Sequence, residues 1–305
     1  MPKPLQVPMF KPETEWVPPT NLPDLSDRKE IAIDLETRDP NLLTMGSGSV
    51  RGDGEVIGIA VAVEGWSGYF PINHEGGGNM DRGLVLDWFE EVLHTDATKI
   101  FHNAMYDVSW IRSMGFQIRG GIIDTLIAAS LIDENRWGYA LNALGREYVG
   151  MGKNEKILQE AAKEWGINPK SEMWRLPAPL VGEYAEQDAV VTLKLWHALQ
   201  HEISKQDLWD VFNMETNLFP CLVDMKFKGV RVDVAKAEAT KAQLVDAEKE
   251  MHRDIQKLAG FDVEIWAAAS IAKAFDIVKL PYDRTEKGAP SFTKNFLATH
   301  PHELP

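Results

Sequence analysis

The stretch EIAIDLET, residues 30–37, decides the fold of this chain. Its apolar and β-branched residues run directly into acids, which predicts a buried strand with a polar end. Asp34 and Glu36 are two residues apart, so their side chains share one face of that strand. Acids at the end of a strand are often simply solvated, and this pair alone does not predict a site.

The segments around this strand predict a sheet with helices on its faces. VIGIAVAV at 56–63 and WSGYFPI at 66–72 follow as strands, and short strands at 99–103 and 121–123 lead into helices. Residues 84–94 carry apolar side chains at helical spacing. From about residue 139 the chain is nearly all helical. The expected fold class is therefore α/β.

The composition divides the chain into three parts. Residues 1–28 are rich in proline and polar residues and predict an extended N-terminal arm. Residues 29–204 form the expected sheet domain, and 205–305 form a second zone. That zone starts with an amphipathic stretch ending at Gly229, a plausible helix C-cap, and continues with a long, heavily charged helix at 234–260. Such a helix is typically a solvated arm.

Charge and cysteine usage limit the classes of function. The net charge of −14 argues against a broad basic surface that grips duplex nucleic acid. It does not exclude a pocket lined by carboxylates that takes a short single-stranded end, because bound cations reverse the local field. The single cysteine, Cys221, rules out a disulfide framework. Without a signal-like start or an apolar run of membrane length, we expect a cytoplasmic protein with no membrane partner.

Two further segments place acids at suggestive positions. In FHNAMYDVSW, Asn103 stands where it could cap a helix that carries Asp107. In GEYAEQDAVVTLKLW, Tyr184 and Asp188 are four residues apart and lie on one helical face. Each segment alone is also explained by a helix cap or an exposed acid. The chemistry depends on their combination with Asp34 and Glu36.

The ordered pattern D-x-E, N-x-x-x-D and Y-x-x-x-D resembles the three exonuclease motifs of the DEDD superfamily, in the subgroup with a tyrosine in the third motif. The resemblance implies a ribonuclease H-like mixed sheet flanked by helices, and two Mg²⁺ or Mn²⁺ ions. Four converging carboxylates could not all ionise without cations, and hard oxygen ligands suit these metals. By the same resemblance, Tyr184 orients the attacking water. The implied metal ligands are Asp34, Glu36, Asp107 and Asp188.

The C-terminal zone narrows the resemblance to one family. METNLFPCLVDMKFKGVRVD at 214–233 and WAAASIAKAFDIVKLPYDRTEKGAPSFTKNFL at 266–297 resemble the segment after the exonuclease domain and the start of the thumb in A-family DNA polymerases. FHNAMYD and MWRLPA are similar to phage-type members. The second zone would then be a helical linker and a truncated, thumb-like segment. The polymerase catalytic motifs do not occur, so we expect no polymerisation by this chain alone.

The family implies a 3′-5′ proofreading exonuclease that acts during DNA replication. It would release nucleoside monophosphates from the 3′ end of single-stranded or frayed DNA. Its partner would be the polymerase portion with palm and fingers, in cis or in trans. The expected substrate-binding residues flank the motifs and are Thr37, Asn103, Met105 and Tyr106. His102 is a candidate for a supporting role beside them.

Two alternatives stay open at this point. An RNA-trimming exonuclease of the same superfamily would carry a helical nucleic-acid-binding appendage in place of the thumb-like stretch. A non-catalytic DNA-binding fragment of a polymerase would keep its acids for structural reasons. It would bind single strands without metal-dependent cleavage.

Overall fold

The structure is a computed structural model and describes residues 14–152 and 154–300. By its contacts the chain divides into two compact units, one ending at Gly229 and the other beginning at Val230. The sequence placed this division after residue 204. The difference lies in the helix that follows residue 204, because that helix packs against the first unit.

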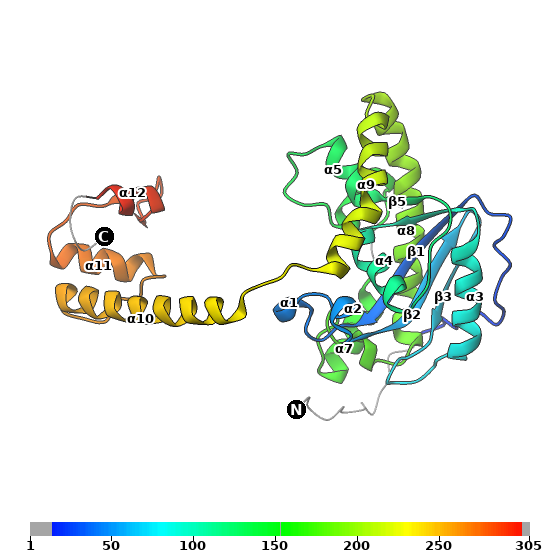
Figure 1. Cartoon of the computed structure of the whole chain (residues 1–305), viewed down its shortest axis with the longest axis horizontal. Helices are drawn as coiled ribbons and strands as arrows, with labels where there is room; N and C mark the ends of the chain where they lie inside the picture. Colours follow the sequence, from blue (N-terminus) through cyan, green and yellow to red (C-terminus); the bar gives the residue numbers. More distant parts are fainter. Residues whose placement is uncertain (1–13, 153, 301–305) are drawn as a thin grey trace. The chain divides into compact units, whose positions relative to one another are not determined.

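The first unit is built on a mixed five-stranded sheet. Its strands are β1 (Glu30–Arg38), β2 (Glu55–Val63), β3 (Trp66–Pro71), β4 (Thr98–Phe101) and β5 (Ile122–Asp124). The order across the sheet is β3-β2-β1-β4-β5. β2 pairs antiparallel with both of its neighbours, whereas β4 pairs parallel with β1 and β5. This arrangement, visible in Figure 1, confirms the expected α/β class and its ribonuclease H-like sheet.

Helices cover both faces of the sheet. They are α3 (Arg82–His94), α4 (Ala104–Ser113), α5 (Thr125–Ile132), α6 (Leu141–Leu144) with a following π-helix (Gly145–Val149), α7 (Lys156–Trp165), a 3-10 turn (Met173–Arg175) and α8 (Pro179–Lys205). Strand β1 alternates between two cores. Ile31 and Ile33 pack with α3 and α4, while Ala32 packs with α5 and α8. The side chains of Asp34 and Glu36 follow Ala32, so they belong to the α8 face.

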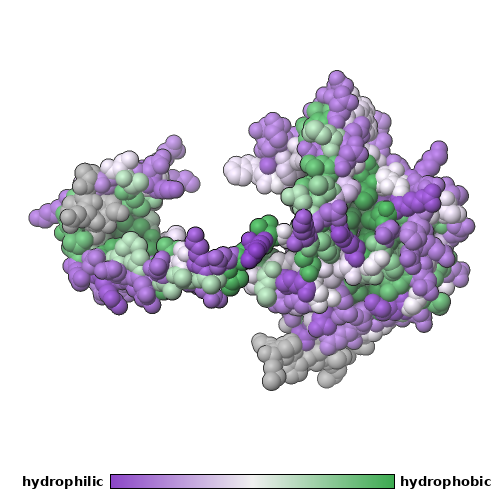
Figure 2. Space-filling model, in the orientation of Figure 1, coloured by the Kyte–Doolittle hydropathy of each residue, from purple (hydrophilic) through white to green (hydrophobic). Residues whose placement is uncertain are grey.

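Helix α9 (Trp209–Lys228) completes the first unit. Its Phe219 and Val223 are buried in the core that contains α3 and α4, and Phe212 is buried in the core that contains α8. The opposite side of α9 carries exposed Met214, and Figure 2 shows hydrophobic residues reaching the surface along this helix. An amphipathic pattern thus predicted the helix, but the sequence did not reveal which unit would bury its apolar face.

The second unit is small. It contains α10 (Val234–Ala259), α11 (Ala268–Ile277), the short strands β6 (Asp283–Arg284) and β7 (Pro290–Ser291), and α12 (Lys294–Thr299). Only Ala259 of α10 is buried, which agrees with the solvated, charged helix expected from the sequence. A cluster of aromatic rings around the buried Phe275 forms the core of this unit.

The predicted N-terminal arm falls partly on residues 1–13, which lie outside the described residues. Residues 14–28 form no helix or strand, yet they are anchored to the first unit. The indole of Trp16 donates to Glu186 at 3.0 Å and stacks over Gly182, where any Cβ would lie 2.3 Å from the ring. Leu25 is buried as well. A glycine on α8 therefore makes room for this anchor.

Two one-turn helices occupy the loop between β1 and β2, namely α1 (Leu42–Met45) and α2 (Gly48–Arg51). The buried carboxylate of Asp39 accepts from the backbone N–H of Gly48 at 2.9 Å. Arg51 forms an ion pair with Asp53 at 2.6 Å. These bonds fix the segment between β1 and β2, which is rich in glycine. Among the helices in the described part of the chain, none combines the length and apolar character that a membrane crossing requires.

Candidate active site

The register of β1 places the first two acids side by side. Asp34 lies opposite Ala60 of β2, and Glu36 lies opposite Gly58. Both partners are small, and the side chain of Tyr69 from β3 packs above Gly58 on the α8 face. At Gly58 a Cβ would lie only 2.0 Å from the hydroxyl of Tyr69, so this position excludes any side chain. The strand thus presents its two carboxylates over a floor of small residues.

Helix α8 brings the third acid to the same place. Asp188 is buried on the face of α8 that packs with the sheet, together with Val191 and Leu195. One ligand oxygen each from Asp34, Glu36 and Asp188 can be chosen so that all lie within 4.8 Å of one another. Three carboxylates this close repel one another strongly in a partly buried site. Such an arrangement of hard oxygen donors fits a divalent cation such as Mg²⁺ or Mn²⁺.

Asp107 stands behind this trio, on the first turn of α4. Its buried Oδ1 accepts from the backbone N–H of Leu35 at 3.0 Å, which ties α4 to the strand between the two acids. Burial, and next the charge of Asp34, raise the pKa of Asp107 well above its usual range. The geometry thus brings together three of the four expected carboxylates, and the charge of Asp34 acts on Asp107, which does not line the pocket described below.

Asn103 begins α4, but its side chain does not cap the helix. The cap comes from Asp124 at the end of β5, whose carboxylate accepts from the backbone N–H groups of Asn103 at 2.9 Å and Ala104 at 2.8 Å. The same carboxylate accepts from Leu126 N at 2.9 Å and so caps α5 as well. Asn103 adopts a left-handed conformation with φ of 65°, which asparagine tolerates better than most residues. Its side chain is thereby left to line the acidic pocket.

The pocket at this site has a volume of about 490 Å³. Asp34, Glu36, Tyr184 and Asp188 line it together with Asn103 and His102, and its remaining wall comes from Leu35, Leu126, Tyr139, Ala140 and Leu141. The other three expected substrate-binding residues do not line it. Thr37 and Tyr106 hydrogen-bond to each other at 2.6 Å, and the carbonyl of Met105 accepts from Ser109 and Lys226 on α9. These three contribute to packing beside the pocket.

The electrostatics of the pocket favour a neutral tyrosine. Burial, and then the charges of Glu36, Asp188 and Asp34, raise the pKa of Tyr184 far above its ordinary value. Tyr184 therefore keeps its hydroxyl proton and can donate it in a hydrogen bond. Burial, and then the charges of Glu36 and Asp34, also raise the pKa of Tyr69, which lies on β3 in the core that contains α8.

Tyr69 belongs to a buried relay of two hydrogen bonds, through His74 to Leu176, that could not be predicted from the sequence. Nδ1 of His74 lies 3.1 Å from the carbonyl oxygen of Leu176, which can only accept, so Nδ1 carries the proton. Nε2 then accepts from the hydroxyl of Tyr69 at 2.7 Å. Burial lowers the pKa of His74 to about 4, in agreement with a neutral ring. The relay joins β3, the loop after it and the segment before α8.

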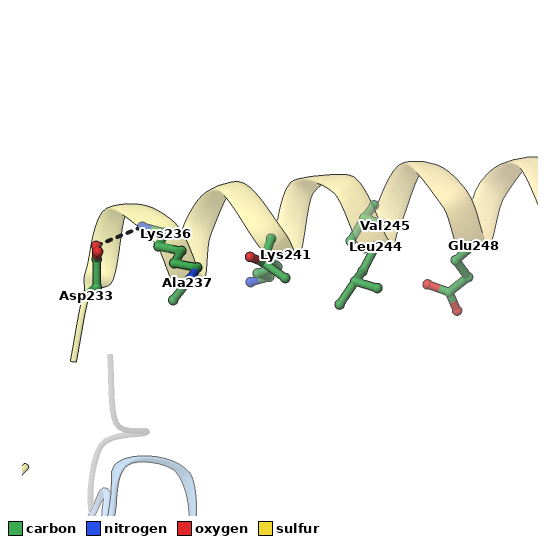
Figure 3. A pocket seen from close by; sticks show the side chains of 8 residues that line it. Asp233, Lys236, Ala237, Lys241, Leu244, Val245 and Glu248 are labelled. Carbon is green, nitrogen blue, oxygen red and sulfur yellow. Dashed lines mark hydrogen bonds between the residues drawn. The ribbon is translucent and has the colours of Figure 1, made fainter.

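Three hollows of the described chain are larger but lack this chemistry. The first, of about 550 Å³, is lined only by α10 and its N-cap Asp233, and Figure 3 shows side chains of that single helix. The second, of about 700 Å³, lies among α4, the segment after it and α9, and its apolar lining includes Phe219. The third, of about 570 Å³, lies between the β2–β3 hairpin and α8, and Glu64 is its single carboxylate. None of them gathers carboxylates as the pocket between β1 and α8 does. That pocket is the candidate active site.

Residues 22–204 match the family model described as 3′-5′ exonuclease. The chain belongs to the 3′-5′ exonuclease domains of A-family DNA polymerases. This match spans the sheet, the three motifs and helix α8, and it confirms the resemblance drawn from Asp34, Asp107 and Tyr184.

Relatives and solved structures extend this assignment. The chain is 34% identical to the "DNA-directed DNA polymerase" of Pseudomonas phage M6, over 98% of this chain and 47% of that protein. It is 28% identical to "DNA polymerase DpoZ" of Salmonella phage PMBT28, over 92% and 45% respectively. The chain thus spans about half the length of these relatives. The POL domain of Pol1 from M. smegmatis, solved with DNA primer-template and dNTP, shares the fold with a TM-score of 0.59 at 15% identity, over 90% of this chain and 42% of that chain.

Proposed function

We propose that this exonuclease domain hydrolyses the terminal phosphodiester of single-stranded or frayed DNA from the 3′ end. The observation that carries the proposal is the convergence of Asp34, Glu36 and Asp188 within 4.8 Å, in a pocket that also holds Tyr184. The residue roles below rest on this geometry together with the motif pattern.

The metal is proposed on the same trio. Asp34, Glu36 and Asp188 would hold a divalent cation, and Asp107 beside Asp34 would help to hold a second, giving two Mg²⁺ or Mn²⁺ ions. When bound, such ions offset the negative charge that builds up on the phosphate and ease deprotonation of the attacking water. Their charge would also relieve the mutual repulsion of the four carboxylates.

Tyr184 and Asn103 would position the attacking water and the substrate. The raised pKa of Tyr184 keeps its hydroxyl protonated, so it can hold the attacking water or a phosphate oxygen by a hydrogen bond. Asn103, fixed in its left-handed conformation by Asp124, would donate its amide to the substrate. The water oxygen bonds to phosphorus as the bond to the 3′ oxygen of the penultimate nucleotide breaks. The terminal nucleotide leaves as a 5′-monophosphate.

The biological setting follows from the family. We propose proofreading during DNA replication in the cytoplasm of a bacterium or of a phage-infected host cell. A mismatched primer end frays more easily into the single strand that such a pocket accepts. The polymerase portion with palm and fingers is the proposed partner, in cis or in trans. Thr37, Met105 and Tyr106 stay candidates for contacts with the strand next to the pocket.

The two alternatives are less well supported. The match of residues 22–204 to the exonuclease of DNA polymerases favours DNA over an RNA-trimming role. The convergence of three carboxylates with Tyr184, and Asp107 next to Asp34, favours catalysis over a binding fragment, because no structural task of the fold requires all five groups.

A ladder assay tests the proposal. A 5′-labelled single-stranded oligodeoxynucleotide and the RNA of the same sequence are incubated with Mg²⁺, with Mn²⁺ and with EDTA. We expect metal-dependent shortening of the DNA from its 3′ end, lost in Asp34→Ala. Asp87→Ala, an exposed acid on α3, is the matched control and should cleave like the wild type. Absence of a ladder with both metals would contradict the proposal, and faster shortening of the RNA would favour the RNA-trimming alternative.

A further inference from the structure

Trp137 is the most exposed large hydrophobic side chain in the described part of the chain. Its relative exposure is 107%. Eight of the ten tryptophans belong to the hydrophobic cores of the first unit or pack against them, and Trp137 and Trp266 do not. An exposed indole presents a large apolar surface to water, which is unfavourable. Its position on the chain therefore requires an explanation.

The segment that carries Trp137 is fixed on both sides. The guanidinium of Arg136 donates to both carboxylate oxygens of Glu147, with Nη1 to Oε1 at 2.8 Å. The hydroxyl of Tyr139 donates to the carbonyl oxygen of Asp133 at 2.7 Å. Figure 1 shows the segment after α5 as a loop that extends away from the sheet. The loop thus holds its exposed tryptophan on an ordered backbone, which lowers the entropy lost when a ligand binds.

This loop leads directly into the wall of the candidate active site. Tyr139, Ala140 and Leu141 line the acidic pocket, and Leu126 on the preceding helix lines it as well. Only Gly138 separates Trp137 from Tyr139, so their Cα atoms are at most about 8 Å apart. An exposed aromatic ring therefore stands close to the place where the terminal nucleotide would lie.

The charges near the loop favour stacking over phosphate binding. Asp133 and Glu134 precede the tryptophan, the neighbouring Arg136 is paired with Glu147, and the chain as a whole has a net charge of −14. A strand drawn across such a surface gains little from ion pairs with its phosphates. Aromatic rings bind single strands through the faces of the bases, independently of sequence and with little need for charge.

We propose that Trp137 stacks on a base of the substrate strand, on the 5′ side of the nucleotide in the pocket. The inference rests on the proposed exonuclease function, because it takes the pocket as the place of the 3′ end. Trp137 is then a positioning residue that holds the strand and takes no part in the bond change. A substrate too short to reach the loop would not benefit from it.

Kinetics on two substrates test this role. Wild type, Trp137→Ala and Trp137→Phe are compared on a long oligothymidylate and on the p-nitrophenyl ester of thymidine 5′-monophosphate, which has no base on the 5′ side, with Mg²⁺. On the long substrate we expect the KM of Trp137→Ala to rise about 5- to 150-fold, the range of one lost base stack, with kcat nearly unchanged. Trp137→Phe should recover most of the loss, and the mononucleotide ester should be cleaved alike by all three proteins. Trp266→Ala, with a side chain 90% exposed in the second unit, is the matched control and should resemble the wild type.

A binding measurement separates failure of the inference from failure of the proposed function. Fluorescence anisotropy of labelled oligothymidylate is recorded in EDTA, where no cleavage occurs. Weaker binding by Trp137→Ala than by wild type would support the stacking role even if no hydrolysis were seen with either metal. Equal binding and equal KM would overturn it. Equal losses on the long and the short substrate would also overturn it, because they would indicate a structural effect on the pocket, and so would a wild type that binds no oligothymidylate.

Discussion

At the scale of single residues, the placement of the acids follows from simple geometry. Asp34 and Glu36 share a face because side chains alternate along β1, and Tyr184 and Asp188 share a face because they are one helical turn apart. Both relations could be predicted from the sequence. The groups that support them could not, because Tyr69 and His74 meet across a loop whose path depends on the packing of the segment before α8. The role of Asp124 could have been predicted, because an acid directly before an apolar helix is typical of an N-cap.

His74 should make the stability of the fold depend on pH. Its pKa is about 4 in the folded protein and near 6.5 in an unfolded chain, so the unfolded state binds more protons between these values. The stabilising contribution is complete above pH 6.5 and is lost as the pH falls towards 4, by about 3 kcal/mol in the free energy of unfolding. The measurement is urea unfolding between pH 7 and pH 4 for wild type and His74→Gln. Equal slopes of stability against pH in the two proteins would contradict this account of His74.

At the scale of elements, the sequence predicts where helices and strands occur better than which of them pack together. The amphipathic pattern of 207–229 predicted α9, yet only the structure shows that Phe219 and Val223 bury against the first unit. The glycine-rich segment between β1 and β2 shows no helix or strand pattern, whereas in the structure it forms α1 and α2, and Asp39 ties Gly48 to the end of β1. In both cases the deciding contact joins residues that local patterns cannot relate.

Asp124 should contribute more to the free energy of unfolding than an ordinary helix cap does. Asp124→Ala removes three accepted hydrogen bonds at the starts of α4 and α5, and we expect a loss of about 1 to 4 kcal/mol in the free energy of unfolding, twice the range of a single cap. Asp81→Ala is the control, since Asp81 is exposed and caps only α3 by accepting from Leu84 N. It should cost about 1 kcal/mol. The measurement is chemical unfolding of both variants. Equal losses in the free energy of unfolding would contradict the proposal that Asp124 caps two helices.

At the scale of the whole molecule, every residue of the candidate site lies before the boundary at Gly229. The residues that follow the boundary form no helix or strand up to α10, and Val230 is 90% exposed. Exposed segments of this kind are preferred sites of proteolysis. The two units should therefore separate under mild digestion without damage to the site.

Limited digestion with trypsin should cut first at Arg231, between exposed Val230 and Val232. The fragment that ends there should keep the metal-dependent shortening of DNA, because it retains β1, α4 and α8 with their acids. Mass spectrometry identifies the first cut, and the ladder assay measures the purified fragment against the intact chain. A first cut within the sheet would contradict the expected exposure of the segment at Arg231. An inactive fragment of the correct mass would show that the second unit supports the site.

The proposed activity depends most on a metal centre formed by Asp34, Glu36 and Asp188. The most direct test is a calorimetric titration of Mn²⁺ into wild type, Asp188→Asn and the control Asp87→Asn. We predict saturable binding by wild type and by the control, with a midpoint that matches the Mn²⁺ dependence of DNA cleavage, and loss of that binding in Asp188→Asn. Unchanged Mn²⁺ binding in Asp188→Asn would contradict the claim, because removing one charge from so tight a carboxylate trio must weaken a cation held there.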